Sequence, residues 1–154
     1  MTNSSLNILL VEDNQDDATL FRMALDQAKV PARLQIVWDG EEALGYLKGE
    51  GKYSDRAAHP LPDFVLLDLN MPRLNGFEVL KWIRHDETFK QLIVHVLTTS
   101  SRDVDVQRVY DLRANSYVIK PSRMNELVTF IGAVVTWQGF VCLPKLPLHE
   151  QTKV

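Results

Sequence analysis

Three carboxylates, a group of hydroxyls and one amine stand directly after short apolar runs of this sequence. Glu12 and Asp13 follow the run LNILLV, and Asp68 follows the run FVLL. A third apolar run leads into four hydroxyl residues at 98–101, and a fourth leads into Lys120. Carboxylates that face one another repel, and each raises the pKa of the others unless a cation joins them. If these residues meet in the fold, they predict a site that holds a cation.

Such a set of side chains suits phosphoryl chemistry. An all-oxygen site with few protein ligands favours Mg²⁺, which keeps several waters and often shares its coordination shell with a phosphate. Lys120 as a compact charge and Thr98 as a hydroxyl donor could hold the other phosphate oxygens. Asp68 would then be the nucleophile that accepts a phosphoryl group.

The elements that must position these residues follow from the apolar pattern. Short apolar runs alternate with stretches whose apolar residues recur every three or four positions. Five strands alternating with five helices are typical of an α/β fold with a doubly wound parallel sheet, in which ligands bind beyond the carboxyl ends of the strands. The predicted strands are 6–11, 33–38, 63–69, 93–97 and 116–119, and the predicted helices are 18–28, 41–48, 77–86, 102–112 and 123–137.

Each candidate residue also has an ordinary structural explanation. Glu12 and Asp13 could lead into a helix whose N-terminus favours negative charge, and Asp68 could cap a strand end. The hydroxyls at 98–101 could be N-cap residues of the next helix, and Lys120 could be a solvated lysine in a turn. A common site explains better why all of them stand at successive strand ends of one sheet.

The composition excludes several other classes of function. The chain has 154 residues, the size of one domain, and a net charge of −3 from 17 basic and 20 acidic residues. That charge argues against a sequence-independent grip on nucleic acid. The single Cys142 can form neither an internal disulfide nor a thiolate metal cluster. Without a membrane-spanning run or a secretory signal, we expect a soluble, cytoplasmic protein that binds neither membranes nor, directly, nucleic acid.

The sequence resembles a known protein family in four short motifs that occur in a fixed order. LLVEDN, VLLDLNMPRLNG, LTTS and YVIKP stand in the order seen in the receiver domains of two-component response regulators, and the resemblance covers roughly residues 7–137. It implies a flavodoxin-like (β/α)5 fold with strand order 2-1-3-4-5. It also implies a domain at 1–137, with residues 138–154 as a C-terminal extension.

The resemblance assigns roles to the acidic residues. Asp68 is expected to be the phosphorylated residue. The carboxylates of Asp13 and Asp68 and the carbonyl of Asn70 are expected to bind Mg²⁺, and Glu12 would reach the metal through water. Many receivers carry two aspartates where this chain has Glu12 and Asp13, a change that keeps the charge and lengthens one side chain.

The resemblance also assigns the groups that sense the phosphoryl group. Thr98 and Lys120 are expected to contact it, and Tyr117 stands where the family places an aromatic residue that moves with that threonine. The peptide bond before Pro121 is expected to be cis. Beyond its own phosphorylation and slow self-dephosphorylation, such a protein is not expected to be an enzyme.

A long loop and the tail point to a subgroup of this family. The loop at 49–62 is longer than in most receivers, and a tryptophan followed by VCLP ends the domain, as in single-domain regulators paired with phytochrome-type histidine kinases. The expected partner is therefore a histidine kinase. Large apolar residues expected beyond the last helix predict a homodimer that uses the fourth and fifth helices and the tail: Trp137, Phe140, Val141 and Leu143.

Other functions on this architecture fit the sequence less well. A mononucleotide binder would need a glycine- and hydroxyl-rich loop after the first strand, where this chain has EDNQDD. A phosphatase with an aspartate nucleophile would normally have a second aspartate where Asn70 stands. A phosphotransfer intermediate and a pseudo-receiver that only binds partners stay open as alternatives, and the complete acceptor set argues against the second.

Overall fold

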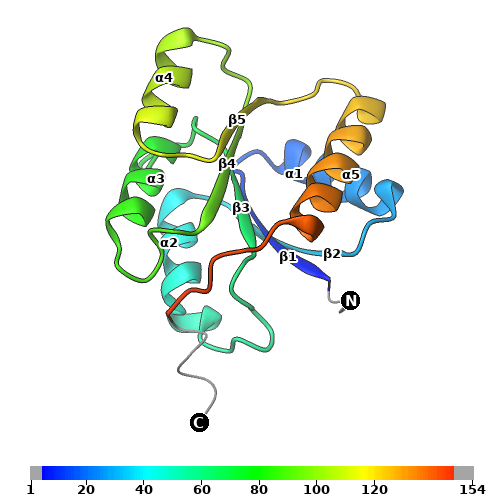
Figure 1. The fold of residues 1–154 in the computed structure, drawn as a ribbon. Coiled ribbons are helices and arrows are strands. Elements are labelled where there is room, and N and C mark those ends of the chain that lie inside the picture. The colour runs from blue at the N-terminus through cyan, green and yellow to red at the C-terminus, as the bar shows by residue number, and fades with distance from the viewer. Residues whose placement is uncertain (1–4, 148–154) are drawn as a thin grey trace.

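A computed structural model describes residues 5–147 of the chain (Figure 1). All strand pairs are parallel, and the spatial order is β2-β1-β3-β4-β5, which confirms the predicted doubly wound sheet. Side chains alternate across the sheet, so Ile8 and Leu10 face one core while Leu9 and Val11 face the other. The strands are β1 (Leu6–Val11), β2 (Ala32–Val37), β3 (Phe64–Leu67), β4 (Ile93–Thr98) and β5 (Ser116–Ile119).

Helices cover both faces of this sheet. Helices α1 and α5 lie on one face, and α2, α3 and α4 lie on the other (Figure 1). Asn14, Asp39 and Asn75 cap three of the helices, each side chain accepting a backbone N–H three residues on. The helices are α1 (Gln15–Ala28), α2 (Gly40–Lys48), α3 (Gly76–His85), α4 (Asp103–Asp111) and α5 (Met124–Phe140), with a 3₁₀ turn η1 (Gly51–Tyr53).

The last helix is longer than the sequence pattern predicts. It continues to Phe140, three residues beyond the predicted end at 137. Trp137 and Phe140 therefore both lie within α5, and the prediction that they lie beyond the last helix is wrong. Gln138 in this last turn is buried, and its Nε2 lies 2.7 Å from His95 Nε2 on β4. That contact holds the final turn against the sheet.

Residues 141–147, the described part of the tail after α5, pack back onto their own domain. They cross beneath the sheet in Figure 1, and Leu146 is buried among side chains of the core that α2 and α3 cover. Leu146 therefore covers part of its own domain's core, and the sequence pattern does not single this residue out. Val141 and Leu143 are half-buried. Within residues 5–147, no helix is both long and apolar enough to cross a bilayer.

The long loop between α2 and β3 is held by one arginine. The Arg56 guanidinium donates to the backbone oxygens of Tyr46, Leu47 and His59 and so satisfies carbonyls at the C-terminal end of α2. The rings of Tyr46 and Tyr53 pack 4.9 Å apart between centroids, and His59 meets both edge-on. The loop is therefore a packed substructure at the amino end of the sheet.

Candidate functional site

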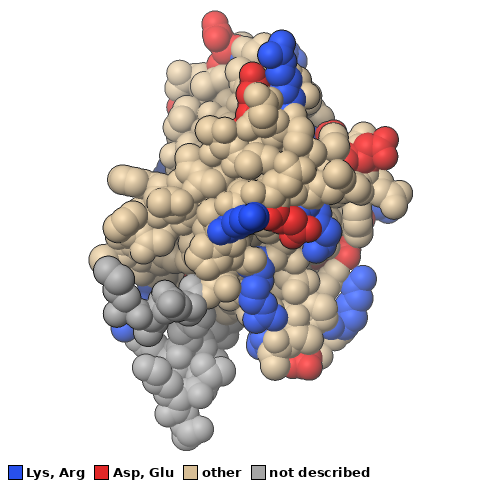
Figure 2. Space-filling view, turned by 90° about the vertical axis from the view of Figure 1, so that its right-hand side faces the viewer, with Lys and Arg blue, Asp and Glu red and all other residues tan. Residues whose placement is uncertain are grey.

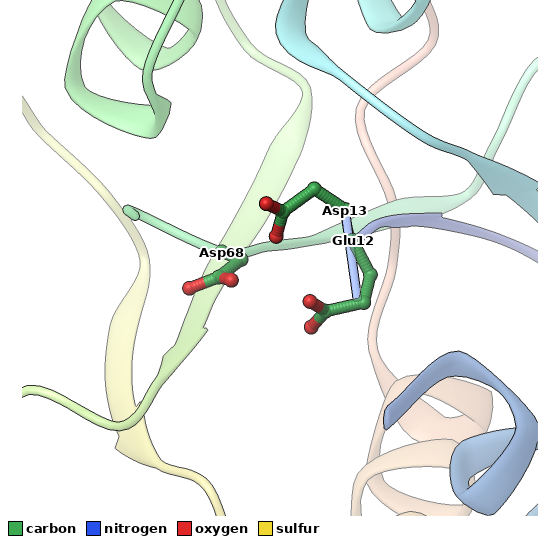
Figure 3. Close-up of side chains that lie close together, drawn as sticks. All are labelled: Glu12, Asp13 and Asp68. Atoms are coloured by element: carbon green, nitrogen blue, oxygen red, sulfur yellow. The ribbon is translucent and has the colours of Figure 1, made fainter. Parts of the chain in front are cut away.

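The three predicted carboxylates converge at the carboxyl edge of the sheet. Glu12 and Asp13 follow β1, and Asp68 is the first residue after β3, because that strand ends at Leu67 rather than at Leu69 as predicted. Carboxylate oxygens from the three side chains lie within 4.8 Å of one another (Figure 3). Glu12 and Asp68 are buried, and Asp13 is exposed.

Lys120 is the cation that faces these carboxylates. Its Nζ lies 2.5 Å from Glu12 Oε2 and 3.5 Å from Asp68 Oδ2. It also lies 3.1 Å from Asp17 Oδ2 in the first turn of α1. The sequence pattern does not single out Asp17, because nothing in its spacing shows that it turns toward the end of β5.

Burial and charge shift the pKa of the two central groups. Burial raises the pKa of Glu12 to about 7; the negative charge of Asp68 adds to this rise, and the hydrogen bond from Lys120 opposes it. Burial lowers the pKa of Lys120, but the hydrogen bond to Glu12 and the charge of Asp68 outweigh burial and leave that pKa raised. The site therefore holds more negative charge than its one lysine can balance.

The polar residues around Asp68 are also brought together. Thr98 is fully buried at the end of β4, and Asn70 Nδ2 lies 3.5 Å from its Oγ1. The Asn70 backbone N–H donates to Asp68 Oδ1 over 3.4 Å. Tyr117 is half-buried and its hydroxyl donates to the Ser100 carbonyl over 2.8 Å.

One expectation about this site is wrong. Every peptide bond among the described residues is trans, including the bond between Lys120 and Pro121, which we had expected to be cis. The trans form is the intrinsically favoured isomer of an X–Pro bond. With this bond trans, Lys120 contacts the carboxylates of Glu12, Asp17 and Asp68.

Two glycines that sequence reasoning passed over shape the loop after Asp68. A Cβ on Gly76 would lie 2.2 Å from the Asp68 carbonyl oxygen and 2.7 Å from the Leu69 Cα. A Cβ on Gly40 would lie 2.4 Å from the Leu74 carbonyl oxygen. The start of α3 therefore packs directly on the backbone that carries Asp68. The sequence signal for this packing is the pair Asn75–Gly76, which enters the sequence analysis only as part of a family motif.

The residues present fit a divalent cation. Three carboxylates share one small region, two of them are buried, and only one lysine opposes them. Oxygen ligands of this kind suit Mg²⁺ or Mn²⁺. Burial is the main cause of the raised pKa of Glu12, and such an ion would offset the negative charge of Asp68 that adds to this rise.

Comparisons with known proteins agree with this geometry. A model of the response regulator receiver domain matches residues 8–132. The probable methanogenesis regulatory protein FilR2 of Methanothrix harundinacea is 40% identical over 134 residues, which are 86% of this chain and 84% of FilR2. The response regulator Rcp1 of Synechocystis sp. is 36% identical over 138 residues, 89% of this chain and 92% of Rcp1.

Solved structures of receivers superpose on nearly the whole chain. The phosphorylated cyanobacterial phytochrome response regulator RcpA matches with a TM-score of 0.82 and 37% identity, over 92% of this chain and 100% of RcpA. The Mn²⁺-bound form of Rcp1 matches with a TM-score of 0.79 and 35% identity, over 91% of this chain and 99% of that structure. By its motifs, its sheet order and these matches, the chain belongs to the family of response regulator receiver domains.

Proposed function

We propose that Asp68 accepts a phosphoryl group from a histidine kinase and that the phosphorylated chain signals through contacts with other proteins. An Asp68 carboxylate oxygen forms the new P–O bond while the P–N bond to the kinase imidazole breaks. The observation that carries the proposal is that the carboxylates of Glu12, Asp13 and Asp68 meet at one place and that Lys120 contacts two of them, Glu12 and Asp68. A bound Mg²⁺ would supply the positive charge that lets a phosphoryl anion approach them.

The surrounding residues take the following roles in this proposal. Asp13, Asp68 and the Asn70 carbonyl would hold the metal, with Glu12 reaching it through water. Lys120 is already at the site and would pair with a phosphoryl oxygen. The Thr98 hydroxyl would donate to another oxygen and, with Tyr117, report the change to the surface of β5. The Tyr117 hydroxyl already donates to the Ser100 carbonyl over 2.8 Å, so its ring is tied to the residues that follow β4.

Phosphorylation should depend on both Asp68 and a divalent metal. A small acyl phosphate with Mg²⁺ should add one phosphoryl group to the wild type, visible as a mass increase and as slower migration in a phosphate-affinity gel. Asp68→Asn should show neither change, and Asp16→Asn on the exposed side of α1 should behave like the wild type. Undiminished labelling in excess EDTA would contradict the metal requirement.

The kinase partner is proposed to be of the phytochrome type. Rcp1 and RcpA support this, because RcpA is a phytochrome response regulator and both match nearly the whole chain. FilR2 is a probable methanogenesis regulatory protein, so a chain of similar sequence is also found with a role other than phytochrome signalling. Transfer of a phosphoryl group from an autophosphorylated phytochrome kinase to Asp68, faster than from an unrelated histidine kinase, is the result that this proposal expects.

The phosphorylated form should lose its phosphoryl group slowly. Neither Asn70 nor Ser100 is acidic, so neither is a good general base for the attacking water. The Ser100 hydroxyl is engaged, because it lies 2.6 Å from Asp105 Oδ2. We expect the purified phosphoprotein to persist for many minutes when its decay is followed by gel. A half-life of seconds would show that another group activates water.

We further propose that two copies of the chain associate through the exposed face of α5, together with α4. Trp137 and Phe140 are 66% and 80% exposed on α5, and no charged residue occurs between Thr129 and Phe140. Figure 2 faces this side of the molecule and shows a broad uncharged area. Exposed apolar patches of this kind usually mark interfaces, and a twofold axis would let each copy cover the other.

The dimer can be tested by sedimentation velocity. At roughly tens of micromolar, a range in which weak interfaces form, the wild type should sediment as a dimer. Trp137→Ser with Phe140→Ser should sediment as a monomer with unchanged helix content. Leu20→Ser on α1, where the side chain is 45% exposed, is the matched control and should stay dimeric. A monomeric wild type would contradict the proposal.

A further inference from the structure

A positively charged pocket lies at the amino end of the sheet, the end opposite to Asp68. It is open, has a volume of about 410 Å³ and lies between the turn from α3 to β4 and the turn from α4 to β5. Three of its lining side chains are cationic and none is acidic. In a chain with a net charge of −3, this excess of positive charge is local. The lining residues are Arg84, Lys90, Gln91, Ile93, Arg113, Asn115 and Pro144.

Arg84 is the buried cation of this pocket. It is only 7% exposed, and its guanidinium binds neutral acceptors alone: the backbone oxygens of Arg113, Lys90 and Leu92 and the Asn115 side-chain oxygen. These bonds use four of the five N–H groups of the guanidinium. One N–H on Nη2 is thus left without an acceptor within residues 5–147. A buried charge without a counter-charge is costly.

The other two cations add to this charge. Within the described part of the chain, neither Arg84 nor Arg113 has a carboxylate partner. Burial, together with the positive charge of Arg113, lowers the pKa of Arg84. Lys90 pairs only with Glu87, which is 88% exposed, so Lys90 can turn away from it at little cost.

We propose that this pocket, formed by Arg84, Arg113 and Lys90, binds a small phosphate-type oxyanion. A tetrahedral dianion offers several acceptor oxygens, so it can accept at once from the free Arg84 N–H, from Lys90 and from Arg113, whose Nη2 donates to the Arg84 carbonyl oxygen over 3.5 Å. It would join the two turns that Arg84 already holds together. This binding is independent of phosphorylation at Asp68, because the two sites lie at opposite ends of the parallel strands.

An NMR titration of the ¹⁵N-labelled full chain with inorganic phosphate, in EDTA, tests the proposal. Sodium chloride of equal ionic strength corrects for general salt effects. We expect saturable shifts at the amides of residues 90–93 and 113–115, while the amides around Asp68 stay in place. Shifts that do not saturate, or that occur only around Asp68 and Lys120, would overturn the proposal.

Variants show whether the side chains of the pocket are responsible. Arg113→Gln and Lys90→Gln should each weaken phosphate binding by about tenfold, as expected for one lost charge-assisted hydrogen bond. Arg22→Gln removes the same charge from an exposed position on α1 and should bind phosphate like the wild type. Arg84→Lys is avoided because Arg84 holds both turns. Equal binding by Arg113→Gln, Lys90→Gln and the wild type would refute the assignment.

Discussion

Replacing Gly76 with alanine should destabilise the protein by about 3 kcal/mol, the upper end of the usual cost of overpacking. The new Cβ would lie 2.2 Å from the Asp68 carbonyl oxygen and 2.7 Å from the Leu69 Cα. Both neighbours are backbone atoms directly after β3, so no side chain can rotate away. Gly76 does not have a positive φ, and the cost therefore comes from this close approach and not from strain in its own backbone.

A second glycine provides the matched control. Gly132 lies inside α5, and a Cβ there would meet nothing within 4 Å. Gly132→Ala should therefore raise the free energy of unfolding by about 0.5–1 kcal/mol, because alanine favours the helix. Urea unfolding measures both variants, and phosphorylation with an acyl phosphate shows whether Gly76→Ala also displaces Asp68. If Gly76→Ala were as stable as wild type, the packing of α3 on the Asp68 backbone would be looser than described.

The fold could be predicted from the sequence because its strands are short apolar runs bounded by polar residues. The predicted 6–11 and 116–119 are the observed β1 and β5, and the other strands differ by one or two residues at their ends. In a parallel sheet every carboxyl end lies at one edge. That rule alone predicts that Glu12, Asp68, Thr98 and Lys120 lie close together.

The features that could not be predicted depend on contacts between distant parts of the chain. Asp17 reaches Lys120 across 103 positions, and the buried pair of Gln138 and His95 spans 43. The end of α5 was placed too early because the helix gains that contact in its last turn. The burial of Leu146 could not be predicted, because the pattern of a tail does not show that a core face is open to receive it.

Metal-free protein should lose stability as the pH rises from about 5 to 8, and Glu12 should be the cause. The pKa of Glu12 is raised to about 7 in the folded protein, against an ordinary value of 4.5. Between these values the folded state binds more protons than the unfolded state, so stability falls with rising pH. The expected loss from this residue is about 2 kcal/mol, less than the full shift implies because the ion pair with Lys120 adjusts.

A second buried group acts in the opposite direction and has to be separated from Glu12. Burial lowers the pKa of His95 below its ordinary value of 6.5, with no charged group contributing to the shift. The unfolded state therefore binds the additional proton below pH 6.5, and stability from His95 increases as the pH rises to that value. Near pH 5–6 the two effects partly cancel in the wild type.

The difference between the wild type and Glu12→Gln removes the contribution of His95, because both proteins contain it. Glutamine keeps an oxygen that can accept from Lys120 but cannot titrate. In EDTA, Glu12→Gln should gain about 2 kcal/mol relative to the wild type between pH 5 and pH 8. Saturating Mg²⁺ should restore the free energy of unfolding of the wild type at pH 8. It should raise the free energy of unfolding of Glu12→Gln less, because the ion offsets a charge that the variant lacks. Parallel stability curves for the two proteins in EDTA would show that Glu12 is already ionised at pH 5 and that its burial is balanced by Lys120 alone.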